Sequence, residues 1–238
     1  MVIIYNATQE IPSSLSEFYE ALFHTLLTRH DRTKPGFRRK RSTALSDSEL
    51  KRLFEAFCYA ARQRDQLALT ESAAGELLVS ASGITGIACK AEPFLNDITK
   101  VACLMQQEGF DYHFLHKSVA EFHAASFISH TSEENARKFY DGVRDQKWQK
   151  WRQELEFLAQ IDRVRYLRYL FVPSATQAFA EFGIDTNDTD ISRGQVLNVM
   201  NRMEALTSPV AQGPSGGFCS LDVGISYPSA FTVASAVT

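Results

Sequence analysis

The histidines between Phe110 and His130 are the residues whose types and spacing could do chemistry. This stretch, FDYHFLHKSVAEFHAASFISH, holds four of the six histidines of the chain. An imidazole can ligate a metal ion, transfer protons or donate a hydrogen bond to a phosphate. His113, His116 and His123 could therefore belong to a metal site, to a catalytic site, or to a structural joint whose histidine contacts something outside the chain.

The spacing of these histidines disfavours a metal site. Two ligands on one helix need a separation of three or four residues, usually with a carboxylate nearby. His116 precedes a predicted helix, and His123 follows it by seven residues. His113 and His116 fall on opposite faces of a strand, because side chains alternate along a strand. We therefore assign no metal ligands.

The motifs of nucleophilic and phosphate chemistry are not found in the sequence. There is no G-x-S-x-G motif, and the glycines of GITGIACK and GPSGGF are not followed by the G-K-[ST] of a phosphate-binding loop. Ser118 lies close to His116, but a serine in the first turn of a helix more often caps it. We expect that the chain alone is not an enzyme and binds no cofactor.

The elements that must position these histidines are predicted to be helices and one hairpin. Ser14 with Glu17 and Ser46 with Glu49 have the spacing of capping boxes that open helices. Two further helices are expected. One runs from Thr70 to near Ile84, with Leu77, Leu78 and Ala81 facing inward, and one starts around Pro93, with Phe94, Leu95, Ile98 and Val101 facing inward.

Glu108-Gly109 is the predicted turn of a small hairpin, and KSVAEFHAASFIS returns to helix. Several helices, a hairpin and a closing helix form the order expected of a winged-helix domain. The predicted fold class is thus mainly α, with a winged-helix-like domain that includes a small β-hairpin, followed by a smaller helical region.

The expected domain boundaries are residues 1–130 for the winged-helix-like domain, 131–207 for the C-terminal helical region, and 208–238 for a low-charge tail. In the helical region, one apolar stripe is stopped by Pro173 and a last helix is capped by Ser192 with Gln195. The stripes contain Trp148, Trp151, Leu155 and Leu158, and then Val164, Leu167, Leu170 and Phe171.

Composition excludes several classes of protein. A net charge of −3 gives no overall bias toward nucleic acid or membranes, and no apolar run has the length of a membrane span. The four cysteines contain no CxxC pair, which is typical of free thiols in a reducing compartment. We therefore expect a cytoplasmic protein that does not contact a membrane.

The basic segment from Arg29 to Arg41 keeps nucleic acid open as a partner. Its seven Lys and Arg residues could contact phosphates, or they could form a solvated loop after a helix. The helix TESAAGELLVSASGI, if it were a recognition helix, has two glutamates and no Lys or Arg to present to a groove. A winged-helix DNA-binding transcriptional regulator and a stand-alone protein-interaction module both remain alternatives.

Two segments of the sequence resemble one protein family. FLHKSVAEFHAA resembles the F-[FIL]-H-x-[ST]-F-Q-E-[FY]-x-A-A signature in the winged-helix domain of NACHT-type STAND NTPases, which include animal NLR receptors and bacterial antiphage NACHT proteins. IPSSLSEFYEALFHTLLTRHD is similar to the segment that follows the NTPase core in bacterial members. The resemblance covers roughly residues 1–130.

The resemblance implies a role for one residue. His116 matches the family histidine that contacts the β-phosphate of bound ADP and holds the protein in its closed, inactive arrangement. Phe114, Phe122, Ala124 and Ala125 would be core residues that fix the hairpin against its helix. The sequence departs from the signature at Val119, Ala120 and His123, but not at His116.

The expected function is therefore that of a regulatory segment that couples nucleotide state to C-terminal sensing in bacterial antiphage defence. The Walker A and Walker B elements are not in this sequence, so the resemblance implies that ATP or ADP is held by an NTPase core of the parent protein or of an adjacent chain. It also implies oligomerisation on activation and a sensed ligand of unknown identity.

Overall fold

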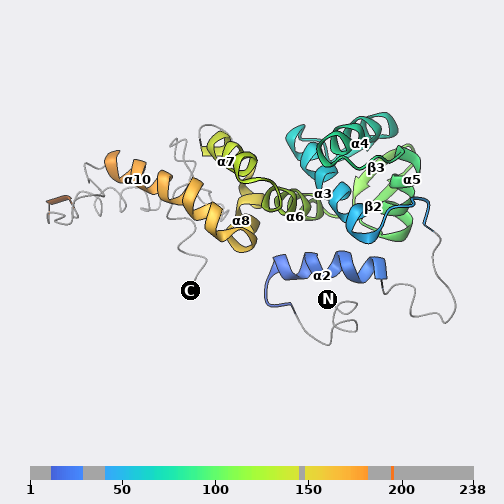
Figure 1. The fold of residues 1–238 in the computed structure, drawn as a ribbon, viewed down its shortest axis with the longest axis horizontal. Coiled ribbons are helices and arrows are strands. Elements are labelled where there is room, and N and C mark those ends of the chain that lie inside the picture. The colour runs from blue at the N-terminus through green and yellow to red at the C-terminus, as the bar shows by residue number, and fades with distance from the viewer. Residues whose placement is uncertain (1–11, 29–40, 145–147, 182–193, 196–238) are drawn as a thin grey trace, which may run out of the picture. The chain divides into compact units, whose positions relative to one another are not determined.

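The computed structural model describes residues 12–28, 41–144, 148–181 and 194–195 (Figure 1). The predicted tail at 208–238 lies outside these residues, as does the predicted helix from Ser192 to Met203 apart from Gly194 and Gln195. The contacts divide the chain into two compact units. Unit 1 comprises Met1–Ala136 with Arg152–Arg163, and unit 2 comprises Arg137–Trp151 with Val164–Thr238.

Unit 1 is built from helices and one small sheet. Its elements in order are α2 (Leu15–Thr28), α3 (Asp47–Gln63), β1 (Ala68–Thr70), α4 (Glu71–Thr85), α5 (Ala91–Asn96), the π-helical turn η1 (Asp97–Val101), β2 (Met105–Glu108), β3 (Asp111–Phe114), α6 (Lys117–Ser129) and α8 (Arg152–Ile161). The prediction of a mainly α fold with a small β-hairpin is confirmed.

Among the described residues the sheet has three antiparallel strands in the order β1-β3-β2. The hairpin turn lies at Gly109-Phe110, one residue beyond the predicted Glu108-Gly109, and Gly109 adopts the positive φ of 64° that such a turn requires. The sequence did not predict β1, which pairs with β3 through Leu69 and Tyr112. From α3 to β3 the elements run in the order helix, strand, two helices and hairpin.

The caps of the helices follow the predicted pattern in part. Ser46 and Glu49 form a complete capping box at α3. At α2 only half of the predicted box forms, because Ser14 accepts from the N–H of Glu17 while the Glu17 carboxylate bonds Ser13 instead. Thr70, the residue from which this helix was predicted to run, is the N-cap of α4, and Gly86 ends the helix in the left-handed conformation.

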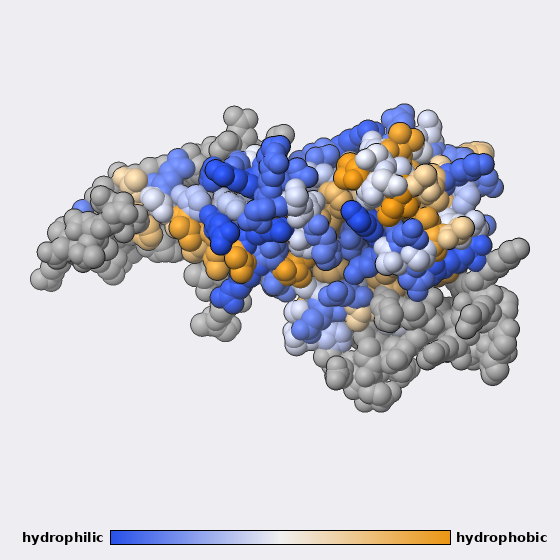
Figure 2. Space-filling view, viewed as in Figure 1, coloured by the Kyte–Doolittle hydropathy of each residue, from blue (hydrophilic) through white to orange (hydrophobic). Residues whose placement is uncertain are grey.

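The core of unit 1 lies between α3 and α6. Its aromatic rings include Phe54 and Phe57 of α3 and Phe114 of β3, with ring centroids 6.3–6.5 Å apart. Each position that the sequence placed inward on α4, α5 and η1 is buried, as are the four residues that the resemblance placed in the core. The exposed apolar side chains of unit 1 include Val79 and Ile84 of α4, and Figure 2 shows apolar surface where Figure 1 draws this helix.

A buried ion pair joins α3 to α8. Arg62 donates from Nε to Oε1 of Glu154 over 2.5 Å, and the two residues are 3% and 0% exposed. The second carboxylate oxygen, Oε2 of Glu154, is buried without a hydrogen-bond partner within the described residues. Burial raises the pKa of Glu154, although the bond from Arg62 opposes this rise.

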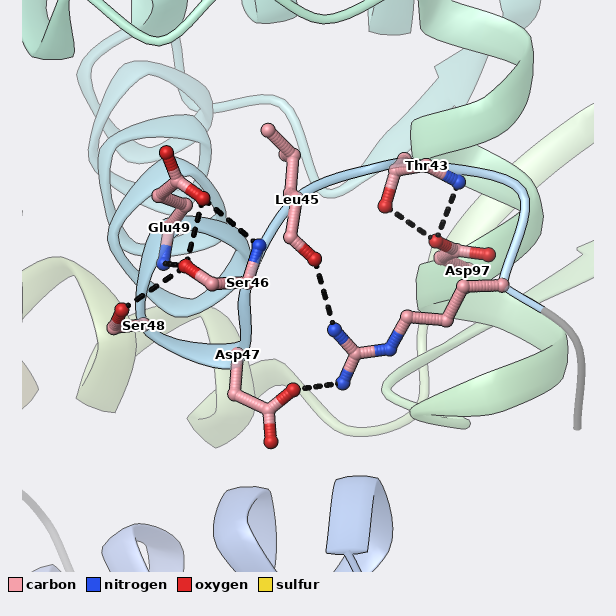
Figure 3. A network of polar contacts seen from close by, with 8 residues as sticks. Thr43, Leu45, Ser46, Asp47, Ser48, Glu49 and Asp97 are labelled. Atoms are coloured by element: carbon pink, nitrogen blue, oxygen red, sulfur yellow. Dashed lines mark hydrogen bonds and ion pairs between the residues drawn. The ribbon is translucent and has the colours of Figure 1, made fainter. Parts of the chain in front are cut away.

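A second polar network fixes the entry into α3 (Figure 3). The Asp97 carboxylate, fully buried at the start of η1, accepts hydrogen bonds from the N–H of Ser42 at 2.7 Å, the N–H of Thr43 at 3.0 Å and the hydroxyl of Thr43 at 2.6 Å. Arg41 bonds the carbonyl of Leu45 and pairs with Asp47. These bonds tie the segment before α3 to the π-helical turn.

Replacing Asp97 by alanine is expected to destabilise unit 1 by about 2 kcal/mol, because two backbone N–H groups lose their partner in a partly buried loop. Urea unfolding of the variant measures this loss. Asp47→Ala is the matched control, because it removes a carboxylate that is exposed, and it should cost less than about 1 kcal/mol. Equal losses in the two variants would contradict the anchoring role of Asp97.

Unit 2 contains α9 (Arg163–Arg165, with its first residue in unit 1), the π-helical η3 (Tyr166–Phe171) and α10 (Val172–Glu181). Helix α7 (Glu133–Gly142) starts in unit 1 and continues into unit 2. The buried residues of unit 2 include Tyr140, Trp151, Tyr166 and Leu170. The predicted stripe from Val164 to Phe171 is thus only partly buried, because Val164 is 66% exposed.

The predicted helix stop at Pro173 is wrong, because α10 continues through this residue to Glu181. In an α-helix, proline leaves the carbonyl four residues earlier without its N–H donor and its ring collides with that carbonyl. Here the wider π-helical turn precedes Pro173, and the side chain of Arg144 donates from Nη1 to the carbonyl of Tyr169 over 3.1 Å. The carbonyl is therefore satisfied and the helix can pass the proline.

Within the described residues, no helix combines the length and apolar character that crossing a membrane demands.

Candidate functional site

His116 lies at the joint between the hairpin and α6, as the sequence predicted. It follows β3 by two residues and forms the N-cap of α6, with extended backbone angles. Its Nδ1 accepts the N–H of Ser118 over 3.2 Å and lies 2.5 Å from the hydroxyl of Ser118. The residue is exposed, and no bond to Nε2 occurs in the part of the chain that the structure describes.

This capping bond selects the form of the imidazole ring. A backbone N–H can only donate, so Nδ1 is the accepting nitrogen and a neutral ring carries its proton on Nε2. The exposed edge of His116 is therefore a hydrogen-bond donor. A donor of this kind suits a phosphate oxygen, and it becomes a charge-assisted donor when the ring is protonated.

Tyr19 connects the pair of His116 and Ser118 to the core by a hydrogen bond. Its hydroxyl makes a short hydrogen bond with the hydroxyl of Ser118, and both residues are buried. With Nδ1 of His116 as acceptor, the chain of donors runs from Tyr19 to Ser118 to His116. The sequence placed Tyr19 on the apolar face of the first helix and predicted no polar role for it. Its spacing from Ser118, 99 residues along the chain, gave no signal of this contact.

The structure does not bring the other two histidines into this site. His113 lies in β3 opposite Ala68 and Gln106. His123 is 1% exposed in the core, surrounded by the edges and faces of Phe23, Phe54 and Phe122 at centroid distances of 4.9–5.3 Å. The described residues hold no group of three or more His, Cys, Asp or Glu side chains that could ligate a metal ion.

His123 has the most perturbed acid–base behaviour of the three histidines. Burial lowers its pKa to about 4, against the opposing attraction of Glu55. Its Nδ1 has no hydrogen-bond partner among the described residues. The ring is therefore a neutral member of the aromatic core at neutral pH.

Glu55 organises a second polar cluster that the sequence analysis missed. This buried carboxylate of α3 accepts the hydroxyl of Ser126 over 2.8 Å, and lies 3.7 Å from Nδ1 of His130 and 3.8 Å from Nζ of Lys51. Burial opposes its ionisation, but His130 and the other neighbours lower its pKa overall. The bond to Glu55 raises the pKa of His130. The one available signal was the spacing of four residues between Glu55 and Lys51.

The candidate nucleic-acid segment lies almost wholly outside the described residues. Arg41, its last residue, is engaged with Leu45 and Asp47. Helix α5 with η1 directly precedes the hairpin, and α4 is separated from the hairpin by these two elements. From β1 to the end of β3 the sequence has six acidic residues against two basic ones, an unfavourable balance for a surface that meets DNA.

Comparisons of this chain with protein-family models, with curated proteins and with solved structures found no match.

Proposed function

We propose that this chain is the switch segment of a NACHT-type STAND NTPase that acts in bacterial antiphage defence. In this role it passes the nucleotide state of an NTPase core, in the same protein or an adjacent chain, to C-terminal sensing residues. The observation that supports the proposal most directly is the geometry of His116, whose Nδ1 is used inside unit 1 while its exposed Nε2 has no partner among the described residues.

The switch depends on one hydrogen bond between two parts of the assembly. Nε2–H of His116 donates to the β-phosphate of ADP held by the NTPase core, and this bond favours the closed, inactive arrangement. A hydrogen bond to a charged group contributes about 1.5–3 kcal/mol, which corresponds to roughly a tenfold to hundredfold change in ADP retention. A ligand can shift a two-state equilibrium by no more than this difference in binding free energy.

The second candidate function is DNA binding, which the order of helices and strands in unit 1 favours. The wing itself carries Glu108 and Asp111 directly opposite each other, with the exposed Phe110 between them and no Lys or Arg. A duplex-binding titration at low salt separates the two functions, because phosphate contacts are strongest there. Absence of binding at low salt removes the DNA-binding candidate.

Two substitutions of His116 separate its capping role from its phosphate contact. His116→Ala removes both and should reduce stability by about 1 kcal/mol, whereas His116→Asn keeps a good N-cap acceptor and should retain most of that stability. Both variants lack Nε2–H, so both should release ADP roughly tenfold to a hundredfold faster from the NTPase that carries this segment. Dissociation of a fluorescent ADP analogue and urea unfolding measure the two effects.

His113→Asn is the matched control, because it removes an imidazole from the neighbouring strand and leaves the cap intact. It should release ADP at the wild-type rate. Wild-type ADP retention and wild-type basal activity in His116→Asn would contradict the proposed function.

A further inference from the structure

A cluster of three aromatic rings brings α8 against the elements that carry His116. Tyr19 of α2 stacks with Phe122 of α6 at a centroid distance of 5.5 Å. Phe157 of α8 meets both rings edge-on, at 6.0 Å from Tyr19 and 5.4 Å from Phe122. All three side chains are buried, so the orientation of the Tyr19 ring depends on the position of Phe157.

The hydroxyl of this same Tyr19 ring is connected to His116 through the hydroxyl of Ser118. It bonds Ser118, and the hydroxyl of Ser118 lies 2.5 Å from Nδ1 of His116. When Tyr19 donates to Ser118, the proton of the Ser118 hydroxyl is directed to Nδ1 of His116, and successive bonds of this kind strengthen one another. A shift of the Tyr19 ring would release the Ser118 hydroxyl to rotate.

Besides these rings, α8 is held against the rest of unit 1 by two buried leucines, Leu155 and Leu158, and by two polar contacts. The polar contacts are the buried pair of Arg62 with Glu154 and a hydrogen bond of 2.9 Å from Ser16 to Gln160. In the sequence α8 lies between two stretches of unit 2, Arg137–Trp151 and Val164 onward. The chain therefore joins the two units at both ends of α8, and also within α7 between Ala136 and Arg137.

We infer that Tyr19 and Phe157 are positioning residues for His116, and that docking of α8 keeps Nε2–H of His116 available to its phosphate ligand. The identification of a phosphate as the ligand of His116 rests on the proposed function. The dependence of the His116 ring on α8 does not rest on it. Undocking of α8 frees the Tyr19 ring and loosens the hold of the Ser118 hydroxyl on Nδ1, whereas the backbone N–H of Ser118 still donates to Nδ1. Release of α8 thus weakens the preference of His116 for the Nε2–H form by the contribution of the hydroxyl bond.

The test is the ratio of the two neutral tautomers of His116 in the full chain without nucleotide. Nitrogen NMR shifts of ¹⁵N-histidine report this ratio at about pH 8.5, where an ordinary imidazole is neutral, and His116→Ala assigns the signal. The wild type should hold the Nε2–H form. Tyr19→Phe keeps the ring packing but removes the hydroxyl, and should change the ratio roughly twofold to tenfold, the value of one neutral hydrogen bond.

Phe157→Ala should change the ratio in the same direction, although it removes no polar group, and Phe157→Leu serves where the alanine variant does not fold. Two matched controls should keep the wild-type ratio. Leu77→Ala removes a fully buried side chain from α4, away from α8, and Tyr59→Phe removes a tyrosine hydroxyl that bonds Gln63 at another place in unit 1.

A wild-type ratio in Tyr19→Phe or in Phe157→Leu overturns the inference, and so does an equal change in Leu77→Ala, because that result reduces the effect to general loosening of the core. The proposed function fails in a different measurement, namely unchanged ADP retention in His116→Asn. The two failures are therefore distinguishable.

Discussion

Replacing Arg62 by alanine is expected to destabilise unit 1 by about 3–5 kcal/mol, because the variant leaves the fully buried Glu154 carboxylate without its only hydrogen-bond donor in the described structure. Glu154→Ala should cost less, since Arg62 keeps the exposed carboxylate of Asp65 at 3.2 Å. The free energy of unfolding from urea titrations measures both losses.

The double variant Arg62→Met with Glu154→Leu should recover most of the loss, because apolar side chains of similar volume often replace a buried pair without cost. The wild type, Arg62→Ala, Glu154→Ala and the double alanine variant form a double-mutant cycle that isolates the coupling between the two residues. Arg64→Ala is the matched control: its pair with Glu76 is exposed and should contribute less than about 1 kcal/mol. Equal losses in Arg62→Ala and Arg64→Ala would show that α8 is not held by this pair.

Acid is expected to destabilise unit 1 through His123 well before its carboxylates are titrated. The pKa of His123 is about 4 in the folded chain and near 6.5 in the unfolded chain. The unfolded state therefore binds the extra proton first, and stability falls as the pH drops from about 6.5 to 4. The full shift corresponds to about 3 kcal/mol of lost stability at pH 4.

Two residues near His123, His130 and Glu55, change the dependence of stability on pH in opposite directions. His130 has a raised pKa, so its pairing with Glu55 stabilises the fold below its unfolded pKa and is lost as the pH rises through the folded value. Glu55 has a lowered pKa, so its contribution is lost only at more acidic pH. Stability should therefore be greatest near neutral pH.

His123→Phe should remove the decline between pH 6.5 and 4, because it replaces a neutral buried ring by one that cannot be protonated and leaves no Nδ1 without a partner. His130→Asn is the control, since it removes an exposed histidine of the same helix and should keep that decline. Urea unfolding at a series of pH values measures both. Persistence of the decline in His123→Phe would rule out His123 as its cause.

Local patterns in the sequence predicted most of the elements of unit 1. The box of Ser46 and Glu49, the helix that begins beside Thr70 and the hairpin turn that contains Gly109 each depend on residues within a few positions of one another. The box and the helix are found as predicted, and the turn lies one residue later. Strand β1 was missed because Ala68–Thr70 is too short for an alternating pattern to show. Pro173 was misjudged because its tolerance depends on Arg144, a residue of another helical segment.

The candidate site, too, could be predicted from the sequence only in its local features. His116 and its place at the joint could be predicted from the short segment around it. The partners that define its chemistry could not, because Tyr19 is distant in sequence and reads as an ordinary apolar position on a helix. Glu154 likewise reads as a solvated charge on an amphipathic helix, and only the fold shows that it is buried against Arg62.

The late position of α8 in the chain has a consequence for biosynthesis. Ribosomes add about 5–20 residues per second, so Ile161 is made ~2–6 s after Ser129. During this interval α3 and α6 can pair, but Arg62 has no Glu154, and the faces of Tyr19 and Phe122 have no Phe157 to cover them. Nascent unit 1 is therefore an incompletely packed intermediate with exposed aromatic side chains for several seconds. A chaperone that recognises exposed aromatic side chains would bind the nascent chain during this interval.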